Sequence, residues 1–240
     1  MDALRHPSLT VRYRVPASHP DWTLSEEPMP ESQPHDLVID LLKALLVAWV
    51  ARAHLDAQVA RNLAVRWDEA HPNIGIDPDL CVITPRTPEG DDLTSLRTWC
   101  EGHTAPRLAI EVVSESNPRK DYRDAPDRYA ELGADELVIF DADCDKGEDR
   151  VRWQRYRRLK RRGFVRVEST NADRIAVKTL GCFLRVVGEG DGARLRIGTG
   201  PAGDALFPTE AEAERVAKEA ALREVAELRA LLAKKGGKRG

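Results

Sequence analysis

A single carboxylate stands inside an apolar segment of the sequence. Residues 107–114 read RLAIEVVS, with Glu111 near the centre. In a strand, Glu111 shares one face with two apolar neighbours, Ala109 and Val113. A buried carboxylate costs free energy unless a cation or strong hydrogen bonds meet it. The chain must therefore fold so that a partner for this carboxylate reaches Glu111. The partner could be a metal cation, a nearby arginine or backbone amides.

A second acid opens another apolar segment. Asp79 follows Pro78 and precedes residues 80–84, LCVIT. If the two segments form neighbouring strands, the carboxylates of Asp79 and Glu111 can reach one hard divalent cation, because such ions prefer oxygen ligands. An ion held there could activate water and neutralise charge on a phosphate during hydrolysis.

The apolar periodicity predicts a mixed α/β protein. We expect a helix over residues 35–54, buried along Leu37, Leu41, Leu45 and Ala48. A second helix over residues 124–132 ends at Gly133. Strands are expected at residues 9–15, 59–67, 80–84, 107–114 and 136–141, a hairpin at 151–157 and 164–168, further strands within 175–187 and 194–197, a short helix around 93–99, and a charged helix over 208–235.

Composition excludes several classes of protein. The net charge of −3 excludes a uniformly basic nucleic-acid binder. The apolar run at residues 37–50 carries Asp40 and Lys43 and is too short to cross a bilayer, so we expect no membrane partner. No signal-peptide pattern begins the chain. The four cysteines form no C-x-x-C pair, which favours reduced thiols and a cytoplasmic location.

Residues 77–141 resemble the putative restriction endonuclease family of bacteria. The matching segments are IDPDLCVI, PRLAIEVVSESN, RKD and DRYAELGADELVIFD. The family pattern has Pro-Asp before a strand, then an apolar strand with a central Glu followed by Ser. A basic pair with Asp, a helix containing Tyr-Ala and a strand ending in Asp complete it. This order of several parts is far more specific than one short motif.

The resemblance implies a restriction-endonuclease-like core of the PD-(D/E)XK type, in helix-strand-strand-strand-helix-strand order. It divides the chain into an irregular segment 1–33, a nuclease-like domain 34–207 with extra β-hairpins, and a charged helix and tail 208–240. The implied activity is metal-dependent hydrolysis of phosphodiester bonds in DNA. Asp79 and Glu111 would be the catalytic acids and would hold Mg²⁺ or Mn²⁺.

The sequence departs from that pattern at its lysine. A complete motif has Lys two residues after the glutamate, where this chain has Val113, and the family often moves it to the next helix, where this chain has Ala125. Lys120 is the nearest lysine and is our candidate to orient the attacking hydroxide, although it could simply be solvated. Arg128 could stabilise phosphate charge but could not act as a base.

Other polar residues lie near the expected site. We expect capping or surface roles for Glu31, His35, Asp36 and Asp40 around the start of the first helix, although such cores often take an additional acid from this point. Asp121 and Tyr129 match the family pattern, and hydrogen bonding and helix packing explain them.

Positive charge is concentrated in residues 150–174. Ten basic and two acidic side chains give this segment a charge of +8, with Trp153, Tyr156 and Phe164 interleaved. Basic groups pair with phosphates and aromatic rings stack on bases, so we predict nucleic-acid contacts. The predicted DNA-binding residues are Arg157, Arg158, Arg161 and Arg162. The alternative is a basic hairpin that only offsets acidic surface.

The C-terminal helix carries a short apolar seam, which includes Val225 and Leu228. About two heptads can assist a homodimer but not specify one alone. We therefore predict a metal-dependent endonuclease acting on DNA. The alternative is a catalytically inactive nuclease fold that binds nucleic acid or acts in assembly, which the missing lysine favours.

Overall fold

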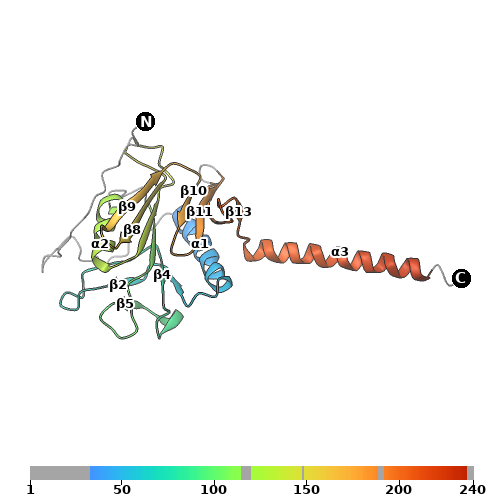
Figure 1. Cartoon of the computed structure of the whole chain (residues 1–240), viewed down its shortest axis with the longest axis horizontal. Helices are drawn as coiled ribbons and strands as arrows, with labels where there is room; N and C mark the ends of the chain where they lie inside the picture. The colour runs from blue at the N-terminus through green and yellow to red at the C-terminus, as the bar shows by residue number, and fades with distance from the viewer. Residues whose placement is uncertain (1–32, 115–119, 148, 189–191, 237–240) are drawn as a thin grey trace. The chain divides into compact units, whose positions relative to one another are not determined.

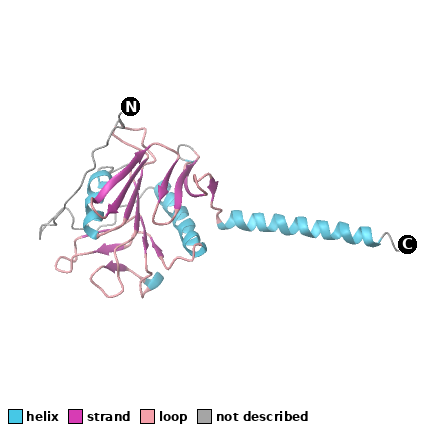
Figure 2. Cartoon of the chain, in the orientation of Figure 1, coloured by secondary structure: helices cyan, strands magenta, loops and turns pink. Residues whose placement is uncertain are grey.

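The apolar segments assemble into a mixed six-stranded sheet in the order β1-β4-β6-β7-β8-β9 (Figures 1 and 2). A computed structural model describes residues 33–114, 120–147, 149–188 and 192–236, so the strand expected at 9–15 and Glu31 lie outside the described residues. The strands are β1 (Gln58–Ala60), β4 (Leu80–Ile83), β6 (Leu108–Val112), β7 (Glu136–Phe140), β8 (Trp153–Leu159) and β9 (Gly163–Thr170).

One crossover gives the sheet its parallel pair. β6 and β7 run parallel, whereas the other neighbours are antiparallel. The connection contains a π-helical turn (Lys120–Asp124) and helix α2 (Ala125–Leu132). Gly133 ends α2 in the left-handed conformation, with φ 97° and its amide bonded to the Tyr129 carbonyl. The predicted C-terminal end of this helix is therefore confirmed.

Two helices cover opposite sides of the sheet. Figure 1 shows α2 on one side and α1 (Gln33–Arg52) on the other. The buried stripe of α1 includes the predicted Leu45, which is 2% exposed, but Leu37 is 56% exposed while Ile39, Leu42 and Leu46 are fully buried. These three residues are spaced by three and four, so the buried face is rotated from the one we expected.

Two smaller sheets complete the part of the chain that ends at Leu206. A four-stranded antiparallel sheet contains β10 (Arg174–Val177), β11 (Cys182–Val187), β12 (Arg194–Thr199) and β13 (Ala205–Leu206). A three-stranded sheet contains β3 (Gly75–Ile76), β2 (Ala64–Arg66) and β5 (Ser95–Arg97).

Two local predictions were wrong. The strand expected at 59–67 is split between β1 and β2, because Asn62 adopts φ 48° and its amide bonds the Pro78 carbonyl at 2.9 Å. The short helix expected around 93–99 is replaced by β5, which pairs parallel with β2. The remaining order of helix, strands, helix and strand agrees with the predicted mixed α/β core.

A buried carboxylate joins two of the sheets. Glu136 at the start of β7 has no exposed surface. Its Oε2 accepts hydrogen bonds from the amide and hydroxyl of Thr179, both at 2.8 Å. Its Oε1 accepts from the Lys178 amide at 3.1 Å and from Arg155 at 3.3 Å. Since residues 178–179 lie between β10 and β11, Glu136 ties the six-stranded sheet to the four-stranded one.

The residues from Phe207 onwards form a second unit, apart from the unit that ends at Leu206. Its helix α3 (Glu210–Gly236) begins with a capping box, in which the Glu212 amide donates to Thr209 Oγ1 and the Thr209 amide donates to Glu212 Oε2. Large apolar side chains are exposed along α3: Val216, Leu222, Val225 and Leu228. Among the described helices, none is long and apolar enough to span a membrane.

Candidate active site

The two predicted acids lie side by side on the sheet. β4 and β6 pair antiparallel with Leu80 opposite Ile110, and this register places Asp79 next to Glu111. The Val112 amide donates a hydrogen bond to Asp79 Oδ2 at 2.7 Å, which holds the Asp79 carboxylate against β6. Both side chains are buried, with Glu111 only 1% exposed. Antiparallel pairing thus brings together two acids that stand 32 positions apart in the sequence.

Tyr129 of α2 contacts Glu111 directly. The Tyr129 hydroxyl donates a hydrogen bond to Glu111 Oε1. The other oxygen, Oε2, is buried and accepts no hydrogen bond from the described residues. Burial, together with the carboxylates of Asp79 and Asp121, raises the pKa of Glu111 well above its usual value. One oxygen of Glu111 is therefore fixed in place, while the other can accept a ligand.

Lys120 lies in the same neighbourhood. It is the first residue of the π-helical turn, and its side chain is partly buried. Burial works against the charged ammonium, but the carboxylates of Glu111, Asp121 and Asp79 outweigh it and raise the pKa of Lys120. The ammonium therefore stays protonated beside three acids.

Asp121 and His35 also reach this site, although sequence reasoning gave them only capping or packing roles. Burial raises the pKa of Asp121 to about 7, against the opposing charge of Lys120. His35 Nε2 lies 2.9 Å from the Val112 carbonyl oxygen and 3.7 Å from Asp79 Oδ2. The signal that could have found Asp121 was its match to the family pattern.

Two acidic candidates are directed elsewhere, while Arg128 bonds a main-chain carbonyl and its charge still opposes that of Lys120. Asp36 and Asp40 both pair with Arg61, and their side chains are 41% and 61% exposed. Arg128 is buried, and its Nη1 lies 3.5 Å from the Gly75 carbonyl oxygen. Asp36 and Asp40 therefore have the surface roles that we expected and do not supply an additional acid to the site.

The charge of the site suits a divalent cation. Asp79, Glu111 and Asp121 together with Lys120 carry a net charge of −2 when all are ionised, in a largely buried place. Within the described ranges, no group of three or more His, Cys, Asp or Glu side chains is arranged to hold a metal ion. Mg²⁺ usually keeps several waters and takes only one or two protein carboxylates, so Asp79 and Glu111 remain a fitting pair.

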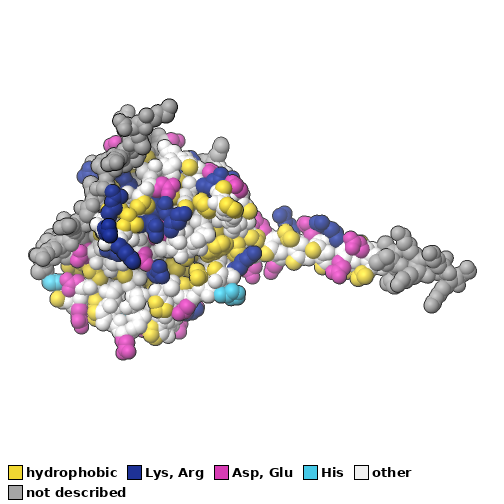
Figure 3. Space-filling view, in the orientation of Figure 1, with side chains coloured by type: hydrophobic (Ala, Val, Ile, Leu, Met, Phe, Trp, Pro, Cys, Tyr) yellow, Lys and Arg dark blue, Asp and Glu magenta, His cyan; other side chains and the backbone are white. Residues whose placement is uncertain are grey.

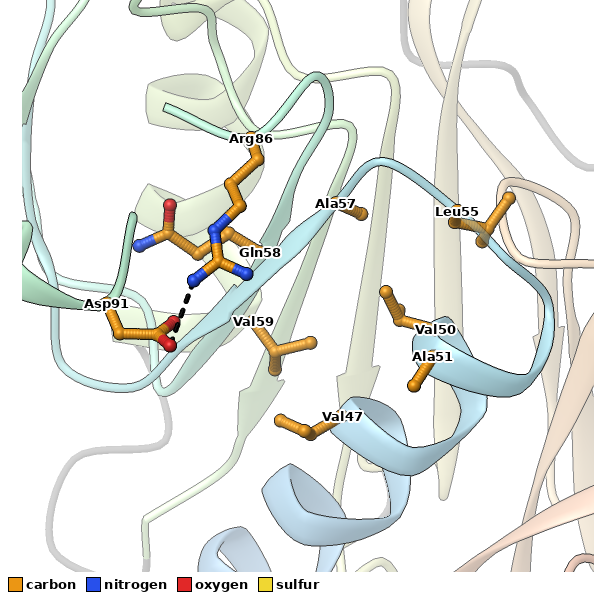
Figure 4. Close-up of a pocket in the computed structure, with 9 residues that line it drawn as sticks. All are labelled: Val47, Val50, Ala51, Leu55, Ala57, Gln58, Val59, Arg86 and Asp91. Atoms are coloured by element: carbon orange, nitrogen blue, oxygen red, sulfur yellow. Dashed lines mark ion pairs between the residues drawn. The ribbon is translucent and has the colours of Figure 1, made fainter. Parts of the chain in front are cut away.

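A cavity of about 210 Å³ lies elsewhere in the fold. Figure 4 shows Val47 and Val50 of α1, and Leu55 from the segment after it, on one side and the ion pair of Arg86 with Asp91 on the other. Val47 lies twelve residues beyond His35 on α1, about 18 Å along the helix axis. This cavity is therefore separate from the acidic site.

Most of the basic residues between 150 and 174 have partners. Arg150 pairs with Asp141, and Arg155 pairs with Glu136 and Glu168. Arg158, one of the predicted DNA-binding residues, donates to the carbonyls of Ala134 at 3.0 Å and Ala130 at 2.7 Å near the end of α2. These contacts make Arg158 part of the packing between β8 and α2.

The turn between β8 and β9 carries three exposed cations of the basic hairpin, Lys160, Arg161 and Arg162. Arg158 and Arg166 on the strands are exposed as well, while Arg157 is partly buried. In Figure 3, Lys and Arg side chains gather over the region where β8 and β9 lie. We call Lys160, Arg161 and Arg162 the basic tip.

The fold and site define a mixed α/β protein with paired acids buried on its central sheet. Residues 23–177 match the family model described as "Uma2: Putative restriction endonuclease", which covers more than half of the chain. The chain belongs to this Uma2 family.

A solved structure is also similar to this chain. It is described as the crystal structure of "a putative nuclease belonging to DUF820 from Anabaena variabilis ATCC 29413". The two chains are 16% identical, with a TM-score of 0.45 over 64% of this chain and 76% of the other. A search of curated proteins finds no match.

Proposed function

We propose that this protein is a metal-dependent endonuclease that hydrolyses phosphodiester bonds in DNA. The observation that carries the proposal is the placement of Asp79 beside Glu111, with the Lys120 ammonium in the same buried neighbourhood. Membership of a restriction endonuclease family supports DNA as the substrate.

Asp79 and Glu111 would hold Mg²⁺ or Mn²⁺. The ion, when bound, supplies a Lewis acid that lowers the pKa of water and neutralises phosphate charge. The Val112 amide and the Tyr129 hydroxyl fix one oxygen of each acid, at Asp79 Oδ2 and Glu111 Oε1. Each carboxylate therefore keeps its orientation without depending on the ion.

Lys120 would orient the attacking water and stabilise negative charge on the phosphate. Its raised pKa keeps the ammonium protonated, so it acts as a hydrogen-bond donor and a positive charge rather than as a base. A flexible four-carbon stem lets the ammonium follow the reacting phosphate.

The basic tip would hold the DNA backbone, with Arg157 beside it. Phosphate contacts supply most non-specific affinity for DNA. Arg158 would contribute through packing, since its guanidinium already bonds two carbonyls.

We also retain the homodimer as a prediction for α3, which the mass of the protein in solution would test.

A catalytically inactive nucleic-acid-binding or assembly protein is the second candidate. The observation in its favour is that both usual lysine positions hold buried apolar side chains, Val113 and Ala125. Such a protein would bind DNA through the basic tip without cleaving it.

Plasmid cleavage with Mg²⁺, Mn²⁺ or EDTA tests the proposal. Asp79→Asn and Glu111→Gln keep the size of each side chain and remove its charge. We expect each to lower the cleavage rate by about 100-fold or more, while Asp36→Asn, a matched acid paired with Arg61, leaves the rate within twofold. Duplex binding without cleavage by the unmodified protein, at every metal concentration, would support the inactive alternative.

A further inference from the structure

A further buried carboxylate, Asp141, directly follows β7. It is fully buried and accepts four hydrogen bonds. Arg150 donates from Nε at 2.7 Å and from Nη2 at 2.6 Å, the Asp143 amide donates at 2.9 Å, and the Tyr122 hydroxyl donates at 2.6 Å. The Arg150 contact is bidentate, which is the strongest form of such a pair. Asp141 is therefore an acceptor held in place from both oxygens.

Tyr122 connects this acceptor to the acidic site. It is the third residue of the π-helical turn, directly after Lys120 and Asp121. Its hydroxyl donates to Asp141 and also accepts from the Val151 amide at 3.1 Å. The ring of Tyr122 packs against the core that contains Tyr129. One side chain thus fixes the turn to the β7–β8 connection.

The turn needs such an anchor. A π-helical turn is an uncommon conformation that often occurs at functional sites. A second hydrogen bond of the turn is long, because the Ser114 amide donates to Asp121 Oδ2 at 3.4 Å. At 2.6 Å, the bond from Tyr122 to Asp141 is the shorter link.

We propose that Tyr122, held by Asp141 and Arg150, is a positioning residue that sets Lys120 and Asp121 beside Glu111. Tyr122 does not touch the substrate, and it acts through the backbone of the turn. The effect on cleavage rests on the proposed function, whereas the effect on the place of Lys120 does not.

Amine labelling tests the place of Lys120 without any assay of activity. The protein is treated with a trace of acetic anhydride, and peptide mass spectrometry compares Lys120 with the exposed Lys160 and Lys218. Tyr122→Phe removes only the hydroxyl. We expect the relative labelling of Lys120 to rise by about fivefold, the factor that corresponds to one lost hydrogen bond.

Tyr156→Phe is the matched control. Tyr156 is also buried, and its hydroxyl bonds Gln154 at 2.8 Å within β8. This variant should leave Lys120 labelling unchanged. Equal labelling in Tyr122→Phe and the unmodified protein, or an equal rise in both variants, overturns the proposal. If Tyr122→Phe does not fold, Arg150→Lys loosens the same carboxylate and should give a smaller rise, and no rise would again overturn it.

Cleavage kinetics supply the second readout. Tyr122→Phe should lower kcat by about tenfold and leave KM within about twofold. Adding Tyr122→Phe to the double variant Lys120→Ala/Asp121→Ala should cause no further loss, because a positioning residue acts only through its targets. Additive losses in kcat would mean that Tyr122 affects cleavage by a route other than the residues it positions, which would overturn this part of the proposal. If the unmodified protein does not cleave DNA but Lys120 labelling rises in Tyr122→Phe, the proposed function fails and the positioning role stands.

Discussion

The hydroxyl of Tyr129 donates its hydrogen bond to Glu111, so a residue of α2 orients the acid at the centre of β6. Both groups are buried, and this bond lowers the pKa of Glu111 against the larger effect of burial. The helix after β6 therefore takes part in the acidic site through its tyrosine, although its usual lysine position holds Ala125.

Tyr129→Phe should weaken metal binding. Without the hydroxyl, both oxygens of Glu111 lack a fixed donor, and the carboxylate loses its orientation. Loss of a group that orients a metal ligand usually costs about tenfold or more in affinity. We expect the Mg²⁺ concentration for half-maximal cleavage to rise by that factor. Tyr156→Phe, which also removes a buried hydroxyl, should not change it, and an equal Mg²⁺ requirement in all three proteins would contradict this role.

Lys120→Ala should lower the rate of metal-dependent cleavage by about 100-fold, because it removes the donor that orients water and stabilises charge. Lys160→Ala removes the same charge at an exposed place and should affect binding more than the rate. Single-turnover cleavage at saturating DNA separates these effects. A Lys120→Ala protein as fast as the unmodified one would remove Lys120 from the mechanism and leave Arg128 as the next candidate.

Replacing the three residues of the basic tip by Ala should weaken DNA binding and its dependence on salt. Each phosphate contact contributes about 0.9 to the log-log slope, so the slope should flatten by up to about 3 units. Fluorescence anisotropy with duplexes of unrelated sequence measures both quantities. The matched control replaces Arg215, Lys218 and Arg223 of α3, which carry the same charge. Equal losses in the two triple variants would show a response to net charge alone.

Arg158→Ala should instead lower stability. The guanidinium bonds two carbonyls near the end of α2 and lies 5.5 Å from the centre of the Phe164 ring. We expect the free energy of unfolding in urea to fall by about 1–2 kcal/mol. Arg161→Ala should leave it unchanged. A stable Arg158→Ala protein that binds DNA poorly would return Arg158 to the predicted interface.

The four thiols should differ in reactivity. Burial raises the pKa values of Cys81 and Cys182 to about 12, so both stay protonated at pH 8. Cys100 and Cys144 are partly exposed. A disulfide reagent should therefore modify Cys100 and Cys144 quickly, and Cys81 and Cys182 only after denaturation, because the thiolate is the reacting form. Fast modification of four thiols in the native protein would contradict the described core.

The sequence was sufficient to predict that Asp79 and Glu111 lie side by side, and to predict the core order. Glu111 stood out because a charge inside an apolar strand demands a partner, and Gly133 marked the end of α2. The split at Asn62 was missed, because a non-glycine residue with positive φ leaves a weak local signal. The link from Tyr122 to Asp141 was missed as well, since hydrogen bonds between distant residues depend on how the sheet closes.

In the basic hairpin, too, contacts between residues distant in the sequence could not be predicted. Its charge was visible in the sequence, but the partners of Arg150, Arg155 and Arg158 were not. These partners are acids and carbonyls brought close by sheet pairing and by the packing of α2. Counting charges therefore took no account of these partners, and the contacts of this segment with DNA stay a prediction.

Glu136 has a consequence for how this chain could be shortened or rearranged. Its carboxylate is satisfied by Thr179 and Lys178, which lie beyond the last strand of the central sheet. A truncation after β9 would remove three hydrogen bonds to this buried carboxylate and leave only Arg155, and a buried acceptor that loses its donors costs about 1–3 kcal/mol. The smallest autonomous nuclease-like fragment must therefore extend past residue 179, and the two sheets should melt in a single transition.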